Sequence, residues 1–316
     1  MRRLVTVLLG AALAFSACST EQPASSRAAA TVDATTTAPP ATDPTRGAGN
    51  DVDLIADRPF EVVVPTTYDG ATPMPLVVLL HGFNITGAMQ EDFFRFQGLA
   101  DSEGFLMVSP DGTRNVDGSP FWNATDACCG LGASVDDSSY LAAVIKQVQA
   151  DYVVDAQRIF LIGFSNGGFM SHRMACDHAE VIAAIVSISA ATFLNPAWCV
   201  PAEPVSVVEI HGTDDDTITY DGGTVEGTAH PSAQQTVAQW ASHNGCSDAP
   251  TVTEAALNLD RALAGKETNV LRYDACAPGG AVELWTILGG EHVPTLSSSF
   301  SETVIDFLLA HPKPSA

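Results

Sequence analysis

Gly163-Phe164-Ser165-Asn166-Gly167-Gly168 is the stretch that decides the fold, because it separates two segments with different hydrophobic patterns. Before it, Ile159–Ile162 is a continuous apolar run, which is typical of a strand buried on both faces. After it, Phe169–Met174 is compatible with a helix. So sharp a turn from strand to helix strains the backbone at Ser165, and side chains at positions 163 and 167 would collide with neighbours. The stretch therefore predicts a turn that presents the Ser165 hydroxyl at the end of a buried strand.

Strands and helices alternate on both sides of this turn. Apolar runs predict strands at 60–64, 76–80, 105–108, 159–162, 181–188, 205–210 and 282–288. Helical spacing predicts helices at 90–100, from the Asp136-Asp137 cap to 148, at 169–174 and at 301–309. This alternation predicts an α/β fold with a mostly parallel sheet and helices on both faces. Residues 217–232 and 247–268 are long enough for small flaps, and we expect no large cap domain.

The composition restricts the kinds of partner. The 316 residues carry 37 Asp+Glu against 14 Lys+Arg, a formal net charge of −23, and 46% are hydrophobic. The apolar content is enough for a large core, which excludes wholesale disorder. The scarcity of basic residues argues against a nucleic-acid partner and against direct attraction to anionic lipid. We expect a solvated exported surface and a monomer.

The N-terminal region has the pattern of an export signal. Arg2 and Arg3 precede an apolar run at 4–15 that is too short to span a bilayer, so residues 1–17 are expected to be a signal peptide. Phe15-Ser16-Ala17-Cys18 resembles the bacterial lipobox, which predicts a lipid on Cys18 as the only membrane anchor. Ordinary cleavage near residue 14 is the alternative. Residues 18–50, rich in Ala, Thr, Ser and Pro, then form a flexible tether, and 51–316 form one catalytic domain.

A serine nucleophile needs a base, and the base needs an acid to orient it. His292 follows the last predicted strand in a Gly-flanked loop, so we expect it to be the base. His81 and His211 each follow a buried strand, and we expect both to be buried and hydrogen-bonded to backbone. One residue of Asp214-Asp215-Asp216 supplies the acid; a metal site is the alternative, but the spacing of a Ca²⁺-binding EF-hand loop is absent. The order Ser, Asp, His is that of the α/β-hydrolases.

The negative charge that develops during attack on a carbonyl needs two prearranged N–H donors. The amide of Asn166 is the first candidate for this oxyanion hole, and the amide of Phe83 in the loop after 76–80 is the second. The Phe83 ring would then line the acyl pocket, with simple packing as the alternative. Trp122 lies in a loop that can border the cleft, where it would stack on an aromatic acid or a polymer segment. Core packing of Trp122 is the alternative.

The motifs come in a familiar order. They are Leu79-Leu80-His81-Gly82, Ser109-Pro110-Asp111-Gly112, Gly163 to Gly168, His211-Gly212-Thr213-x-Asp215 and Gly290-x-His292. Together they resemble the exported esterases grouped as polyhydroxybutyrate depolymerase and feruloyl esterase-like proteins, which are carbohydrate-esterase-type α/β-hydrolases. The resemblance covers residues 52–312. It implies a triad of Ser165, Asp215 and His292 with no metal and no cofactor, and it selects Asp215 from the three neighbouring aspartates.

Three positions depart from that family's pattern. Thr219 stands where Pro is usual, Glu291 where Gly is usual, and Val293 where Trp is frequent. These positions line the mouth of the site, so they leave catalysis intact and the choice of ester open.

The chain contains seven cysteines, and lipidation of Cys18 would leave an even number for disulfides in an oxidising compartment. The resemblance implies a bond between Cys246 and Cys276, and it makes Cys176 and Cys199 a pair. Cys128-Cys129 would form a strained vicinal disulfide or remain thiols.

These observations predict an exported serine carboxylester hydrolase, either a cell-envelope lipoprotein or a secreted protein. Its expected substrates are hydroxycinnamoyl or acyl esters, or polyester chains of the polyhydroxyalkanoate type. A cell-envelope acyltransferase with the same triad and a non-catalytic envelope lipoprotein are the alternatives.

Overall fold

The computed structural model describes residues 51–128 and 134–315. The expected signal peptide, Cys18 and the tether lie outside the described residues, and so does Cys129. Within the described residues, no helix is both long and apolar enough to cross a membrane.

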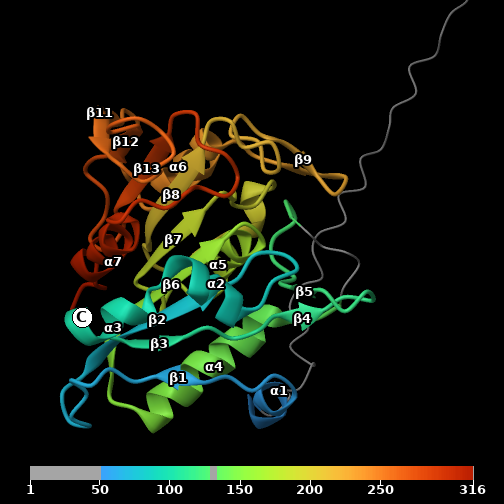
Figure 1. Ribbon diagram of the computed structural model, residues 1–316, viewed down its shortest axis with the longest axis vertical. Coiled ribbons are helices and arrows are strands. Elements are labelled where there is room, and N and C mark those ends of the chain that lie inside the picture. The colour runs from blue at the N-terminus through green and yellow to red at the C-terminus, as the bar shows by residue number, and fades with distance from the viewer. Residues whose placement is uncertain (1–50, 129–133, 316) are drawn as a thin grey trace, which may run out of the picture. The chain divides into compact units, whose positions relative to one another are not determined.

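The described residues form one nine-stranded sheet, in the order β1-β3-β2-β6-β7-β8-β13-β12-β11 (Figure 1). The strands from β3 to β13 along this order run parallel, whereas β1, β12 and β11 are antiparallel to their neighbours. The sheet comprises β1 (Val62–Val63), β2 (Met74–Leu80), β3 (Leu106–Val108), β6 (Val154–Phe164), β7 (Ala184–Ile188), β8 (Ser206–Gly212), β11 (Thr251–Leu257), β12 (Thr268–Tyr273) and β13 (Val282–Ile287). The α/β fold with a mostly parallel sheet is therefore confirmed.

Helices cover both faces of this sheet. They are α1 (Asp51–Asp57), α2 (Gly87–Phe94), α3 (Gln97–Glu103), α4 (Asp137–Asp151), α5 (Asn166–Asp177), α6 (Ala233–His243) and α7 (Phe300–Ala310), with a short 3-10 helix η1 (Pro196–Trp198). Alternate side chains of β2 enter two separate cores, with Val78 on one side and Val77 on the other. The first core contains residues of α4, α5 and α6, and the second contains residues of α2, α3 and α7. This two-sided burial explains the continuous apolar runs in the central strands.

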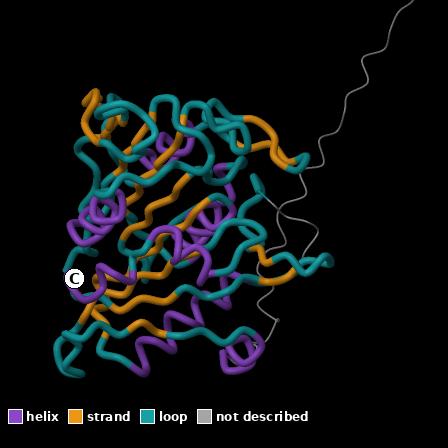
Figure 2. Tube along the Cα trace, viewed as in Figure 1, coloured by secondary structure: helices purple, strands orange, loops and turns teal. Residues whose placement is uncertain are grey.

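Two short hairpins lie outside the main sheet. β4 (Thr113–Arg114) pairs with β5 (Pro120–Phe121), and β9 (Gly223–Val225) pairs with β10 (Thr228–His230). The β9–β10 hairpin projects away from the sheet at the upper right of Figure 2. It lies within 217–232, where the sequence allowed a small flap.

The helix predicted at 90–100 is wrong as a single element, because it is divided into α2 and α3. Arg95 adopts a left-handed conformation with φ 60°, and its amide donates to the carbonyl of Glu91. The Glu91 carboxylate then accepts from the amide of Gln97 at 2.6 Å. The chain therefore turns at Arg95 and starts a second helix.

The sequence also missed β11 and β12. All but the last two residues of β11 have exposed side chains, since it is the edge strand of the sheet. An exposed edge strand has no apolar run, so the segment at 247–268 suggested only a flap.

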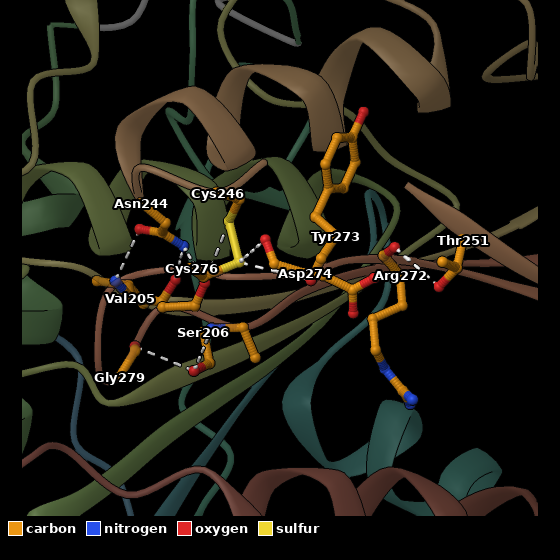
Figure 3. The surroundings of a disulfide bond; sticks show 12 residues. Val205, Ser206, Asn244, Cys246, Thr251, Arg272, Tyr273, Asp274, Cys276 and Gly279 are labelled. Carbon is orange, nitrogen blue, oxygen red and sulfur yellow. Dashed lines mark hydrogen bonds between the residues drawn. A yellow bond between two sulfur atoms is a disulfide. The ribbon is translucent and has the colours of Figure 1, made fainter. Parts of the chain in front are cut away.

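Both disulfides implied by the family resemblance are confirmed. Cys176 at the end of α5 is bonded to Cys199, and Cys246 after α6 is bonded to Cys276 (Figure 3). Beside the second bond, the Asn244 side chain accepts from the amide of Val205 and donates to its carbonyl at 2.7 Å (Figure 3). The end of α6 is thereby fastened to the segment that leads into β8. The expectation for Cys128-Cys129 involves a residue outside the described ones and stays a prediction.

Candidate active site

The turn between β6 and α5 holds Ser165 in strained backbone. Ser165 has φ 52° and ψ −121°, and its amide donates to the carbonyl of Ile188 at 2.8 Å. A Cβ at position 163 would collide with the carbonyl of Gly167, and one at position 167 would lie 2.6 Å from the carbonyl oxygen of His81. The two glycines are therefore required by close backbone approaches, as the sequence predicted. The turn leaves Ser165 partly exposed at the carboxyl end of β6.

Three predicted residues meet at this point. The Nε2 atom of His292 lies 3.0 Å from the Ser165 hydroxyl, and its Nδ1 atom lies 2.8 Å from Oδ2 of Asp215. Asp215 is buried, whereas the neighbouring Asp214 and Asp216 are exposed. The geometry thus selects the same aspartate as the family resemblance. Burial opposes the charge of Asp215, but hydrogen bonds with His211 and His292 outweigh it and hold the pKa of that carboxyl well below its usual range.

The loops that carry the acid and the base are joined to each other. The amide of Asp214 donates to the carbonyl of Gly290 at 2.9 Å, and the amide of Gly289 donates to the Thr213 hydroxyl at 2.7 Å. A Cβ at Gly212 would collide with the carbonyl of Gly290. The close approach explains why glycine occupies position 212 in the loop of Asp215 and position 290 in the loop of His292. The contacts also fix the separation between Asp215 and His292.

The two expected oxyanion donors come from different segments of the chain. Asn166 is the first residue of α5, and Phe83 lies in the loop after β2. Neither amide donates a backbone hydrogen bond to another described residue, whereas both neighbours of Phe83 are held. Gly82 donates to the side chain of Gln90 at 3.0 Å, and Asn84 donates to the carbonyl of Pro120 at 2.8 Å. The loop is therefore fixed on both sides of an amide that stays available.

Trp122 does not border a cleft, so the expectation that it stacks on a substrate is wrong. Its side chain is fully buried, and its indole N–H donates to the carbonyl of His81 at 3.0 Å. Its backbone amide donates to Oδ1 of Asn166 at 2.6 Å, and its carbonyl accepts from Nδ2 of Asn166 at 2.9 Å. The indole N–H requires a partner when buried, and the carbonyl of His81 provides one. Trp122 thus connects the loop of Phe83 to the start of α5.

Sequence reasoning missed Gln90, which lies on α2 and is buried. Glu91 and Asp92 follow it directly, so the sequence offered no signal that Gln90 is buried. His81 agrees with expectation, because its Nδ1 donates to the carbonyl of Gly82 and its Nε2 accepts from the amide of Gly112. His211 also bonds a backbone carbonyl, that of Ile218, but two carboxylates lie beside it as well.

The mouth of the site has exposed apolar side chains. Phe83 is 44% exposed and Val293, next to His292, is 51% exposed. A pocket of about 810 Å³ lies against the loop that follows His292. Its lining includes Phe93, Val293 and Leu296, together with Arg95 and Arg261. Within residues 51–128 and 134–315, no three His, Cys, Asp or Glu side chains gather in a way that could hold a metal ion.

Comparison with known proteins identifies a family for this chain. A family model described as "Esterase PHB depolymerase" matches residues 62–231, which is more than half of the chain. The chain belongs to this esterase family. The matched region contains Ser165 and Asp215, while His292 lies beyond it.

Several relatives of this chain are named as esterases. It is 28% identical to "Feruloyl esterase B" of Piromyces equi over 74% of the chain and 42% of that protein. It is 29% identical to "Probable feruloyl esterase C" of Aspergillus flavus over 63% of the chain and 67% of that protein. The chain thus spans less than half the length of the Piromyces relative.

Solved structures share the fold. An acetyl xylan esterase from Aspergillus awamori superimposes with a TM-score of 0.57 at 16% identity, covering 78% of this chain and 93% of that one. Esterase PE8 gives a TM-score of 0.52 at 16% identity, covering 80% and 99%. At such low identity these similarities establish the α/β-hydrolase fold alone.

Proposed function

We propose that this protein is a serine carboxylester hydrolase. The observation that carries the proposal is the continuous series of hydrogen bonds from the Ser165 hydroxyl through His292 to the buried Asp215 carboxylate. Nucleophile, base and orienting acid are within the distances that proton transfer requires.

The reaction follows from these positions. Nε2 of His292 accepts the Ser165 proton as the hydroxyl oxygen attacks the ester carbonyl, and Asp215 stabilises the imidazolium that forms. The amides of Phe83 and Asn166 donate to the oxyanion of the tetrahedral intermediate. His292 then protonates the leaving alcohol, and the acyl group stays on Ser165. A water molecule that His292 deprotonates releases the acid and restores the hydroxyl. No metal or cofactor enters any of these steps.

Ser165→Ala tests the reaction. The variant should hydrolyse a short-chain p-nitrophenyl ester at least a thousandfold more slowly than the unaltered protein, because the nucleophile is lost. Ser102→Ala is the matched control, since Ser102 is an exposed serine on α3. Undiminished hydrolysis by Ser165→Ala would refute the proposal. Transfer of the acyl group to an added alcohol in preference to water would instead identify an acyltransferase.

For the substrate, we propose hydroxycinnamoyl or acyl esters, or polyester chains. Relatives named feruloyl esterase and the exposed apolar side chains of Phe83 and Val293 beside the triad support this class. A panel of methyl ferulate, acetylated xylan and poly-hydroxybutyrate distinguishes these esters. Hydrolysis of none of the three, by a protein that cleaves the p-nitrophenyl ester, would exclude all three as substrates.

We also propose that residues 51–316 form the catalytic domain of an exported monomer, anchored by a lipid on Cys18 after removal of residues 1–17. Two disulfides within the described residues support an oxidising compartment. Metabolic labelling with a radioactive fatty acid should mark the full chain and fail to mark Cys18→Ser. A label that persists in Cys18→Ser would contradict the anchor, and elution at twice the expected mass would contradict the monomer.

A further inference from the structure

Buried polar side chains continue from Asp215 into the interior of the protein. Glu209 and His211 lie on β8, and His172 lies on α5. Glu209 and His172 have no exposed surface, and His211 is 1% exposed. The proposed reaction assigns no role to any of them, although burying such groups costs free energy unless they are paired.

The hydrogen bonds fix the proton positions at the inner end. The indole N–H of Trp240 donates to Nδ1 of His172 at 2.9 Å, so the proton of His172 is on Nε2. That nitrogen lies 3.3 Å from Oε2 of Glu209, and the amide of Ala190 donates to Oε1 of Glu209 at 3.1 Å. Burial opposes the charge of Glu209, but hydrogen bonds from His172 and His211 lower its pKa. Glu209 is therefore a buried carboxylate.

His211 has acceptors at both ring nitrogens. Nδ1 lies 3.1 Å from Oε1 of Glu209. Nε2 lies 2.7 Å from the carbonyl of Ile218 and 3.3 Å from Oδ2 of Asp215. A neutral imidazole would present one nitrogen lone pair to a lone pair of its neighbour, so both nitrogens must carry protons. Burial opposes this charge, but the hydrogen bonds to Asp215 and Glu209 outweigh it and raise the pKa of His211 to about 10.

Asp215 is thus held from several directions. Its Oδ1 accepts from the amides of Thr217 and Ile218 at 2.9 and 2.8 Å. Its Oδ2 faces both His211 and His292. One carboxylate oxygen therefore connects a buried imidazolium to the catalytic base.

Resting on the proposed esterase activity, we propose that His211 and Glu209 are positioning residues for the triad. His211, held as an imidazolium between the two carboxylates, fixes the orientation of Asp215 and places a positive charge 3.3 Å from the carboxylate oxygen that faces His292. Glu209 balances the charge of His211. The pair acts on His292 only through Asp215 and touches no substrate.

Tyr220 and His230 are the other titratable groups near His211. The ring of Tyr220 contacts the His211 ring edge-on with centroids 5.7 Å apart, and Thr286 on β13 bonds its hydroxyl. Burial lowers the pKa of His230 on β10, so that ring adds no positive charge near neutral pH. The charged groups that contact His211 directly are Glu209 and Asp215, and His172 contacts Glu209 on its other side. Of these groups, His211 therefore provides the positive charge beside Asp215.

The pH profile of kcat/KM tests the proposal, because a merely structural role would lower the rate equally at every pH. In His211→Gln the acid limb should move about one unit to higher pH, since a cation beside Asp215 is lost. The rate at the midpoint of the original limb should then fall several-fold more than the rate on the plateau. In Glu209→Gln the limb should stay or move to lower pH, because a negative charge is lost. The exposed Asp216→Asn is the control and should keep the original profile.

Two outcomes would overturn the inference. One is an acid limb that does not move upward in His211→Gln, and the other is an upward movement of the same size in Glu209→Gln. Complete absence of hydrolysis by the unaltered protein would instead overturn the esterase proposal, so the two failures are distinguishable.

A second measurement does not depend on activity or on the folding of either variant. The full chain with Ser165→Ala and 15N-labelled histidine should show one ring that keeps two N–H protons at pH 8.5, where an ordinary imidazole is neutral. A spectrum in which every imidazole is neutral at that pH would overturn the inference.

Discussion

Gly167→Ala should separate the two halves of the proposed oxyanion hole. The new Cβ would lie 2.6 Å from the carbonyl oxygen of His81 and closer still to that of Leu80, whereas ordinary contact begins near 3.4 Å. The distances from the new Cβ to these two oxygens are therefore about 1 Å shorter than ordinary contact. Both oxygens belong to the backbone and cannot rotate away. The start of α5 must move away from the end of β2.

The size of the effect follows from that displacement. A shift of about 1 Å between Asn166 and Phe83 should lower kcat about a hundredfold, since misplacement of this size commonly costs that much. Forcing a methyl group into packed backbone should also lower the free energy of unfolding by about 1–3 kcal/mol. The loss of kcat should exceed any change in KM, because the donors act mainly on the transition state.

The assay is steady-state hydrolysis of a p-nitrophenyl ester, with urea unfolding of the same preparations. Gly98→Ala is the matched control, because Gly98 lies in α3 and a Cβ there would meet nothing within 4 Å. That control should keep full activity and gain slightly in stability from the better helix former. If Gly167→Ala keeps kcat within threefold of the unaltered protein, the close approach does not position the site and the reasoning is wrong.

Two further predictions concern buried polar groups. Trp122→Phe removes the donor to the carbonyl of His81 and should destabilise the protein by about 1–3 kcal/mol, with kcat reduced more than KM is changed. Trp198→Phe, at a half-buried Trp, is the control, with urea unfolding and steady-state kinetics measured on both variants. Equal losses of stability and kcat in the two variants would contradict a role of the Trp122 hydrogen bond in positioning the site. The raised pKa of His211 stabilises the fold fully below the unfolded-state value of 6.5, and this stabilisation is lost as pH rises through about 10. The contribution of this group to the free energy of unfolding should therefore fall as pH rises over that interval. Urea unfolding of the unaltered protein and His211→Gln at pH 6.5 and 9 checks this, and equal pH slopes in the two proteins would count against it.

Local patterns predicted the central sheet well, because strands buried on both faces have an unmistakable apolar run. They failed at the edge strand β11, whose mostly exposed side chains carry no such run, and at Arg95, where a left-handed residue divides a helix. Neither feature follows from hydrophobic spacing. β11 depends on its pairing with β12, whereas the turn at Arg95 depends on local hydrogen bonds to the carbonyl and carboxylate of Glu91.

The sequence by itself determined the serine turn and the order of a serine, an aspartate within 214–216 and His292, because backbone strain and strand ends leave local signatures. The family resemblance then selected Asp215. Only the tertiary structure decided what surrounds them. Trp122 is a buried connection and not a substrate platform, and Glu209 and His211 form a charged pair behind Asp215. Their roles depend on which partners meet a buried polar group, and those partners come from segments far apart in the chain.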